Sequence, residues 1–167
     1  MPTHIIRSAS STDAAAISRI YNPYIETTAI TFEEVKVTEE EMARRIADVA
    51  SAELPWLVLE VGNVLVGYAY ATKWRARMAY RFSVESAVYL DPSDAGKGFG
   101  TILYNALLQE LRRRGLHLVV GGIALPNAGS VALHEKLGFK KVAHFTEVGL
   151  KFGRWIDVGY WELNLTK

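Results

Sequence analysis

The sequence contains no cysteine, and this absence excludes several kinds of chemistry. Without thiols the chain forms no disulfide, no thiolate metal site and no covalent intermediate on a cysteine nucleophile. The four histidines, His4, His117, His134 and His144, show no metal-ligand spacing. We therefore expect no metal centre and a reaction without a covalent enzyme intermediate.

An excess of charge of either sign is also missing, because 19 lysine and arginine residues face 18 aspartate and glutamate residues. The formal net charge of +1 gives no strong field for attracting nucleic acid or an anionic membrane. No apolar run reaches the length of a membrane span, and residues 1–7 lack the pattern of a signal peptide. We expect a cytoplasmic protein that binds neither nucleic acid nor membrane.

The chain has the length and the apolar content of one globular domain. Its 167 residues, half of them hydrophobic, suffice to bury a single core, and no linker or internal repeat divides them. We expect one domain over residues 1–167. Periodicity and turn residues predict strands at 5–7, 56–61, 64–70, 81–90, 118–123, 140–146 and 156–165.

Helices are predicted after Ser11 or Thr12, after Thr38, after the glycines near residue 98, and over residues 127–136. Thr38 and Glu41 form a capping-box pattern, and Gly62-Asn63 predicts a tight hairpin. The resulting order, β-α-α-β-β-β-α-β-α-β-β, indicates an α/β or α+β domain whose mixed sheet carries helices on both sides.

A glycine-rich loop between a predicted strand and a predicted helix is the most informative segment. Glycines allow backbone N–H groups to approach an oxyanion, and a helix start adds its dipole, so the loop suits phosphates. The spacing Gly96-x-Gly98-x-Gly100 is not the dinucleotide fingerprint, and Lys97 lacks the Ser or Thr that must follow it in an ATP-type loop. Taken alone, the pattern is equally typical of a tight turn shaped by glycine.

The segment 126–139 resembles the second acyl-CoA motif of the GCN5-related acetyltransferase (GNAT) superfamily, Asn-x-x-Ser/Ala-x-x-x-Tyr-x-x-x-Gly-Phe. The matching residues are Asn127, Ser130, Gly138 and Phe139. His134 stands where tyrosine is usual. The glycine loop resembles the first motif, Arg/Gln-x-x-Gly-x-Gly/Ala, with Gly98 and Gly100 matching and Ala95 at the Arg/Gln position.

The resemblance narrows to phosphinothricin and methionine sulfoximine N-acetyltransferases and extends from about residue 5 to residue 165. The segments that carry it are 21–22, 27–33, 67–70, 74–77, 84–86, 125–127 and 157–161. It implies the GNAT fold, with a mixed, mostly antiparallel, twisted central sheet, splayed at the acetyl-CoA site between the strands that end at Leu90 and Ile123. It also implies a homodimer, with residues 151–161 lining either the active site or the dimer interface.

Acetyl-CoA is the co-substrate that the resemblance implies, and most of its contacts are expected from the backbone. The implied pantetheine residues are Val88, Tyr89 and Leu90. The implied pyrophosphate residues are Gly96, Lys97, Gly98, Phe99, Gly100 and Thr101. Asn127 and Lys136 complete the predicted cleft, with Lys136 near the 3′-phosphate; taken alone, Lys136 is slightly better explained as a solvated helix lysine.

Glu85 is the candidate general base. It lies in an apolar strand, where an unpaired carboxylate is costly to bury and where burial raises its pKa toward the useful range. The alternative is an outward-facing glutamate, or one paired with Arg75 or Arg77. The match of Val84-Glu85-Ser86 to the acetyltransferases favours the base.

His134 is the candidate general acid, because it occupies the position of the superfamily tyrosine near the expected thiol. A structural histidine is the alternative. Tyr104 is a second candidate, and its predicted role is packing.

Arg75 and Arg77 are expected to bind the carboxylate of an amino-acid-like substrate. On a strand their alternation puts both on one face, where two guanidiniums can hold an oxyanion bidentately. Phe32, Trp74 and Tyr80 are expected to wall a small apolar slot, or to lie in the core or at a dimer surface. The predicted substrate-binding residues are Phe32, Arg75, Ala76, Arg77, Glu85, Ser86 and Ala87.

The resulting hypothesis is an N-acetyltransferase that transfers acetyl from acetyl-CoA to the α-amine of methionine sulfoximine, methionine sulfone or phosphinothricin. Two alternatives remain open. One keeps the fold and takes a protein N-terminus or a polyamine as acceptor, although a polyamine site should be acidic. The other is a non-catalytic acyl-CoA-binding module, against which Glu85 argues.

Overall fold

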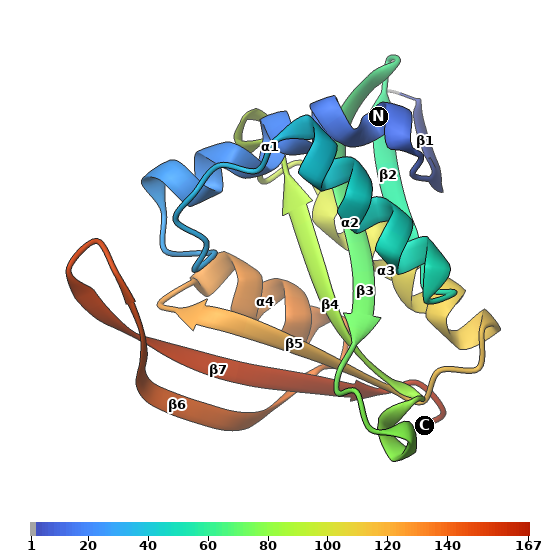
Figure 1. Ribbon diagram of the computed structural model, residues 1–167. Helices are drawn as coiled ribbons and strands as arrows, with labels where there is room; N and C mark the ends of the chain where they lie inside the picture. The colour runs from blue at the N-terminus through green and yellow to red at the C-terminus, as the bar shows by residue number, and fades with distance from the viewer. Residues whose placement is uncertain (1–2) are drawn as a thin grey trace.

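A seven-stranded mixed sheet organises the chain in the computed structural model, which describes residues 3–167 (Figure 1). The strand order is β1-β2-β3-β4-β5-β7-β6, and β4 and β5 form its parallel pair. The strands are β1 (His4–Ser8), β2 (Trp56–Val61), β3 (Val64–Lys73), β4 (Ser83–Leu90), β5 (Leu118–Leu125), β6 (Lys140–Lys151) and β7 (Arg154–Asn164). The helices within this range are α1 (Ala14–Thr27), α2 (Glu39–Ser51), α3 (Phe99–Arg113) and α4 (Ala128–Lys136).

The helices cover opposite faces of the sheet. In Figure 1, α1 and α2 lie in front of β2, β3 and β4, whereas α3 and α4 lie behind. We call these the front face and the rear face. The predicted α+β architecture and the predicted order of elements are confirmed.

Cap and turn residues determine where several helices and strands begin or end. The Thr38 hydroxyl accepts a hydrogen bond from the Glu41 N–H (3.1 Å) and caps α2 as predicted. Gly62 and Asn63, with φ of 56° and 64°, form the predicted hairpin turn between β2 and β3. The predicted start of the first helix was wrong by a turn: a 3-10 helix spans Ser11–Asp13, and α1 follows it.

β3 and β6 run furthest beyond their predicted ends. β3 continues to Lys73 because its last residues pair antiparallel with the start of β4. β6 continues to Lys151 and meets β7 at a tight turn in which Phe152 and Gly153 have φ of 52° and 70°. The longer β6–β7 hairpin forms the outer edge of the front face.

Candidate functional site

A narrow slot passes through the sheet where β4 and β5 separate. Their pairing joins residues 83–85 to residues 118–120, and beyond these residues the strands diverge. A cavity of about 80 Å³ fills the gap. Its lining residues are Ile30, Ser86, Ala87, Val88, Tyr89, Gly122, Ile123, Ala124, Asn127, Ser130 and His134. Successive residues of a strand point to opposite faces of the sheet, so the residues that line the slot reach both faces. The slot therefore connects the rear face to the front face.

The predicted phosphate loop lies at the rear, where α3 begins. Gly96 and Gly98 have φ of 78° and 85°, conformations that favour glycine. Lys97 is ion-paired with Asp94 (2.7 Å), and the Phe99 side chain is buried in the core. The donors that the loop can offer to an anion are therefore its backbone N–H groups and those of the first turn of α3.

The other predicted cofactor residues lie around the rear and open end of the slot. Val88 and Leu90 are on the part of β4 that has no partner from β5. The Leu90 carbonyl accepts a hydrogen bond from the Tyr24 hydroxyl (2.6 Å), which ties α1 to the end of the strand. Asn127 caps α4 through its side-chain oxygen (3.1 Å to the Ser130 N–H), and Lys136 is exposed at the far end of that helix.

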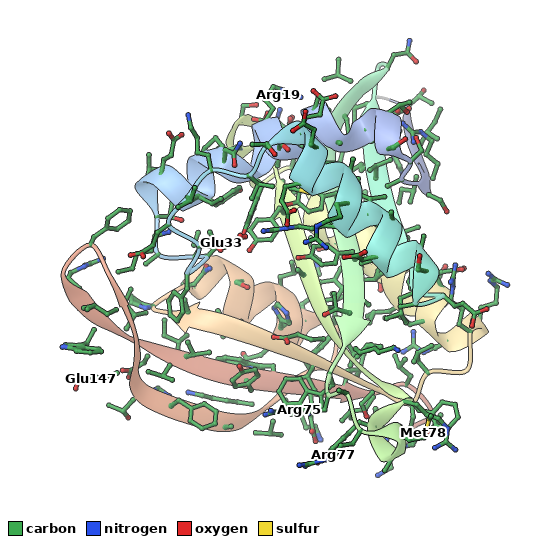
Figure 2. The ribbon with its side chains drawn as sticks, viewed as in Figure 1. Arg19, Glu33, Arg75, Arg77, Met78 and Glu147 are labelled. Carbon is green, nitrogen blue, oxygen red and sulfur yellow. The ribbon has the colours of Figure 1, made fainter. Side chains whose placement is uncertain are left out.

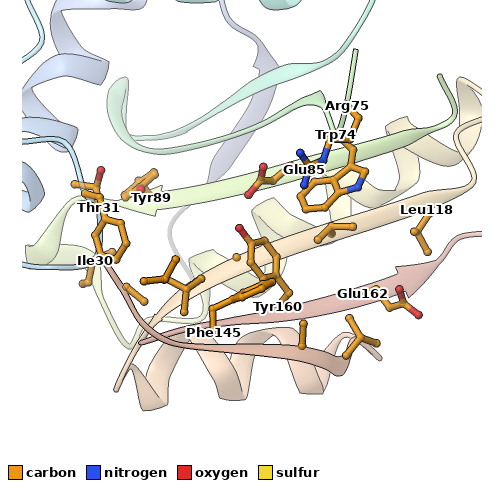
Figure 3. Close-up of a pocket in the computed structure, with 18 residues that line it drawn as sticks. Ile30, Thr31, Trp74, Arg75, Glu85, Tyr89, Leu118, Phe145, Tyr160 and Glu162 are labelled. Atoms are coloured by element: carbon orange, nitrogen blue, oxygen red, sulfur yellow. The ribbon is translucent and has the colours of Figure 1, made fainter. Parts of the chain in front are cut away.

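The front end of the slot opens into a larger cavity of about 710 Å³, shown in Figure 3. Its walls come from the α1–α2 connection, the β3–β4 connection, and the front faces of β4, β5, β6 and β7. The lining residues are Ile30, Thr31, Phe32, Trp74, Arg75, Glu85, Tyr89, Leu118, Val120, Gly122, Ala124, Val142, Ala143, Phe145, Val148, Val158, Tyr160 and Glu162. We call this space the front cavity.

Glu85 lies where the slot meets the front cavity, beside Gly122, which lines both spaces. It pairs with Val120 at the last rung of the β4–β5 ladder, so its side chain lies beside the place where the strands part. Burial raises the pKa of the Glu85 carboxyl, and the nearby positive charge of Arg75 opposes that rise. Figure 3 shows both side chains on the same side of the cavity.

Gly122 brings β5 close to this carboxylate. A Cβ atom at Gly122 would lie 3.3 Å from Glu85 Oε1 and 3.0 Å from the Tyr160 ring. Glycine therefore leaves room for Glu85 and Tyr160 to face each other across the strand. Tyr160 belongs to residues 151–161, which the resemblance placed at either the active site or the dimer interface, and it lines the front cavity. The Gly121-Gly122 pair inside a buried strand is a separate signal of a close approach.

The predicted placement of the two arginines on one strand is wrong. β3 ends at Lys73, and Arg75, Ala76 and Arg77 lie in the connection to β4. Arg75 lines the front cavity and packs over the Trp74 ring (5.0 Å), whereas Ala76 and Arg77 are not among the lining residues. Figure 2 places Arg77 at the lower margin of the molecule.

The other predicted substrate residues divide between the two spaces. Phe32 and Trp74 line the front cavity, and Ser86 and Ala87 line the slot. Tyr80 lies in the exposed β3–β4 connection and is not among the residues that line either space.

Polar contacts hold the α1–α2 connection over the front cavity. Arg45 donates two hydrogen bonds to Glu33 (2.6 and 2.9 Å), and the Tyr21 hydroxyl donates to the same carboxylate. The Arg45 guanidinium lowers the pKa of Glu33. Lys151, with 1% of its surface exposed, donates from Nζ to the Thr31 carbonyl (2.8 Å). The role of Lys151 was not predicted, because its partner lies 120 residues away.

A hydrogen-bonded chain lies behind the slot. The Ser86 hydroxyl is 2.5 Å from the Tyr104 hydroxyl, which is 3.0 Å from His134 Nε2. His134 Nδ1 lies 2.7 Å from the Ser130 carbonyl oxygen. Burial lowers the pKa of His134, and the Ser130 carbonyl opposes that shift. Tyr104 thus bonds to both neighbours as well as packing against Phe139.

Over residues 3–167, no group of three or more His, Asp or Glu side chains is arranged to hold a metal ion. No helix in the same part of the chain is long and apolar enough to cross a membrane.

Comparisons with known proteins identify the family to which the fold belongs. Residues 6–159 match the family described as the acetyltransferase (GNAT) domain. The chain is 41% identical over 160 residues to a phosphinothricin N-acetyltransferase of Streptomyces viridochromogenes, covering 94% of this chain and 85% of that protein. It is 40% identical over 163 residues to an L-methionine sulfoximine/L-methionine sulfone acetyltransferase of Salmonella typhimurium, covering 96% of this chain and 94% of that protein.

A solved structure provides a three-dimensional counterpart. It is a GNAT-superfamily phosphinothricin acetyltransferase from Sinorhizobium meliloti in complex with acetyl-CoA. The TM-score is 0.93 and the identity 33%, over 97% of this chain and 88% of that chain.

Proposed function

Because the chain belongs to the GNAT acetyltransferase family and is an N-acetyltransferase, we propose that it transfers acetyl from acetyl-CoA directly to the α-amine of a small amino-acid analogue. Methionine sulfoximine, methionine sulfone and phosphinothricin are the proposed acceptors. Relatives at 40% and 41% identity carry the names of these compounds. The single observation that carries the proposal is the position of Glu85 where the slot opens into the front cavity.

In this proposal the cofactor enters from the rear. The backbone N–H groups of residues 96–101 bind the pyrophosphate, since the helix start supplies donors and a favourable dipole. The backbone of Val88, Tyr89 and Leu90, which pairs with β3 on one side and has no partner from β5 on the other, binds the pantetheine amides across the gap. Asn127 shapes the rear of the slot, and the exposed Lys136 meets the 3′-phosphate.

The acceptor occupies the front cavity. Arg75 binds its carboxylate, and the rings of Phe32, Trp74 and Tyr160 surround its side chain. This arrangement directs the α-amine toward Glu85. A polyamine lacks the carboxylate that Arg75 would bind, which disfavours that alternative.

Glu85 acts as the general base. The attacking amine must be neutral, so the substrate ammonium gives up a proton before or during attack on the thioester carbonyl. A carboxylate whose pKa is raised by burial is a better base than an exposed one, and it takes the proton directly or through one water.

A second copy of the chain is also part of the proposal. Six large apolar side chains are half or more exposed on the β6–β7 hairpin: Val142, Phe145, Val148, Leu150, Phe152 and Trp155. An apolar surface of this kind is costly to leave in water, and the cover we propose for it is the same hairpin of a partner chain. Sedimentation equilibrium of the purified protein should show a dimer, and a monomer at micromolar concentration would refute it.

The deciding experiment measures thiol release from acetyl-CoA with a panel of amines. Methionine sulfoximine, methionine sulfone and phosphinothricin should react, whereas spermidine and a peptide with a free N-terminus should react at least tenfold more slowly in kcat/KM. Faster reaction of the peptide or the polyamine would replace the proposed acceptor. No thiol release with any amine, together with acetyl-CoA binding, would leave a non-catalytic acyl-CoA-binding module.

The test of the base is Glu85→Gln, which keeps the size of the side chain and removes its basicity. We expect kcat to fall roughly 100-fold or more, as is typical for loss of a general base, with acetyl-CoA affinity unchanged in calorimetry. An unchanged kcat would remove Glu85 from the mechanism.

A further inference from the structure

The hydrogen-bonded chain behind the slot begins at a slot-lining hydroxyl and ends at a helix backbone. It runs from Ser86 on β4 through Tyr104 on α3 to His134 on α4 and ends at the Ser130 carbonyl. All three side chains are buried, with 8%, 0% and 7% of their surfaces exposed. Ser86 and His134 also line the slot.

The carbonyl oxygen fixes where the protons lie. Because the Ser130 carbonyl only accepts, His134 Nδ1 carries the hydrogen of that bond. A neutral imidazole has one N–H, so Nε2 accepts and the Tyr104 hydroxyl donates to it. The Tyr104 hydroxyl then has no second hydrogen to donate, so the Ser86 hydroxyl donates to Tyr104. With His134 neutral, every proton of the chain points away from the slot.

An imidazolium reverses this direction. Both ring nitrogens donate in the charged form, so Nε2–H donates to Tyr104 and Tyr104 donates to Ser86. The Ser86 proton is then released toward the slot. Two states of the chain therefore differ by one proton and by the direction in which its hydroxyls donate.

We propose that this chain delivers the proton that the departing CoA thiolate requires. When the C–S bond breaks, its electron pair stays on sulfur. The Ser86 hydroxyl proton moves to sulfur, the Tyr104 proton moves to Ser86, and the Nε2 proton moves to Tyr104. The imidazolium becomes the neutral imidazole, and a proton from solvent recharges it before the next turnover. The inference rests on the proposed use of the slot by acetyl-CoA.

The direction of transfer is favourable. A thiol, with an ordinary pKa of about 8.5, holds a proton more tightly than an imidazolium, with an ordinary pKa of about 6.5. Burial, which lowers the pKa of His134 further, increases that difference. Because the proton moves through two hydroxyls, His134 need not contact the sulfur itself.

No charged partner holds His134 in one state. In the described part of the chain it faces Tyr104, Phe139, Gly121 and the Ser130 carbonyl, of which Tyr104 alone titrates. Glu135, the next residue on α4, accepts a hydrogen bond from the Trp161 indole instead. Without a fixed charge beside it, burial alone favours the neutral imidazole, and the charged form is reached by taking a proton from solvent.

Gly121 on β5 leaves space for the central bond of the chain. A Cβ atom there would lie 2.6 Å from His134 Nε2 and 3.7 Å from the Tyr104 hydroxyl. Ser86 follows Glu85 on β4, so the two side chains point to opposite faces. One proton therefore leaves the amine at the front, and another reaches the sulfur from the rear.

The test is Tyr104→Phe, which keeps the ring packing and removes the relay hydroxyl. Single-turnover rates with acetyl-CoA, and with whichever amine the wild type uses best, isolate the chemical step. We expect a 10–100-fold slower step, an unchanged acetyl-CoA KM, and a solvent deuterium proton inventory that changes from bowed to linear. Ser86→Ala should have the same effect, and the double variant should be no slower than either single variant.

The matched control is Tyr68→Phe, which removes a buried hydroxyl from β3 with the aromatic stacking kept. It should leave the rate and the proton inventory unchanged. A Tyr104→Phe enzyme with a wild-type single-turnover rate would overturn the relay. So would a slower Tyr104→Phe enzyme with a lower melting temperature, a raised KM and an unchanged proton inventory, which indicates a structural role. Failure of the proposed acceptors alone leaves this test intact, because it uses any amine that turns over.

Discussion

The two connections that wall the front cavity differ in how they are held. The α1–α2 connection (residues 28–38) is tied to three other elements through Tyr21, Arg45 and Lys151. The β3–β4 connection (residues 74–82) is mostly exposed, and apart from the edge-on contact of Trp74 with Tyr160 (5.7 Å) its side-chain contacts are local, such as Arg75 over Trp74. The first wall therefore fixes the shape of the cavity, whereas the second contributes a charge.

This difference has an energetic side. Segments with few buried contacts have low local stability and reorganise at little cost. Arg75 therefore loses conformational entropy when its side chain binds an oxyanion. The hydrogen bonds between Arg75 and the oxyanion must offset that loss. The α1–α2 connection, which we call the anchored wall, has already lost this conformational freedom on folding. It therefore contributes to binding through the shape of the cavity.

The largest effect is expected from one of the two arginines in the β3–β4 connection, which we call the exposed wall. Arg75→Ala should raise the KM of the amine acceptor roughly 10–100-fold, because a charged hydrogen bond contributes about 1.5–3 kcal/mol. Arg77→Ala, the matched control outside the cavity lining, should change it less than threefold. Steady-state kinetics with both variants checks this, and equal losses would show that Arg77 also reaches the substrate.

The same variant makes a prediction about pH. Arg75 opposes the rise in the pKa of Glu85, so its removal raises that pKa further. The base acts deprotonated, and the acid limb of the kcat/KM profile should therefore move to higher pH in Arg75→Ala. If the acid limb does not move, it reports the titration of a group other than Glu85.

The next largest effect tests the anchor of the other wall. Lys151→Met keeps the apolar stem but leaves the buried Thr31 carbonyl without its donor, which should lower the free energy of unfolding by about 1–3 kcal/mol. Lys141→Met on the same strand, where the lysine is exposed, should cost less than about 0.5 kcal/mol. Urea unfolding of both variants measures the difference, and equal stabilities would contradict the anchoring role.

A smaller effect is expected from crowding the anchored wall. In Gly149→Ala the new Cβ would lie 2.2 Å from the Phe32 ring, which must turn away. Because Phe32 is partly exposed and can move, we expect a stability loss of about 1 kcal/mol and a roughly fivefold higher acceptor KM. Wild-type kinetics would mean that Phe32 does not shape the acceptor site.

The smallest effect concerns the ion pair of the anchored wall. Arg45 lowers the pKa of Glu33 in the folded chain below its unfolded value, so the pair stabilises the fold above about pH 4.3. That stability is lost as the pH falls through the folded pKa. Glu33→Gln should cost less than about 1 kcal/mol at pH 7, since the pair is partly exposed, and progressively less as the pH falls through the folded pKa. A pH-independent cost would point to packing.

The sequence predicted best where a local pattern has one structural solution. Thr38, Gly62-Asn63 and Asn127 each carry a turn or cap signal, and the structure confirms the element that each one starts or joins. The order of elements followed from such signals and from hydrophobic periodicity. The site was less predictable, because its parts meet through the sheet and not along the chain.

The errors have physical causes. Alternation in Arg75-Ala76-Arg77 resembles a strand, but no partner strand reaches this segment, so it forms a connection. The buried position of Lys151 could not be predicted, because it depends on a partner 120 positions away. The hydrogen-bonded chain from Ser86 through Tyr104 to His134 could not be predicted either, since it combines one side chain from each of three elements.

The gap between β4 and β5 has a consequence for how this enzyme could be altered. In the proposed function, the donor is bound by main-chain groups of β4, which every amino acid other than proline provides. The acceptor is bound by side chains on the connections and on the outer hairpin. Exchanging those side chains would change which amine is accepted and would leave the binding of acetyl-CoA unchanged. The fold therefore separates two kinds of specificity, and a designer could alter one at a time.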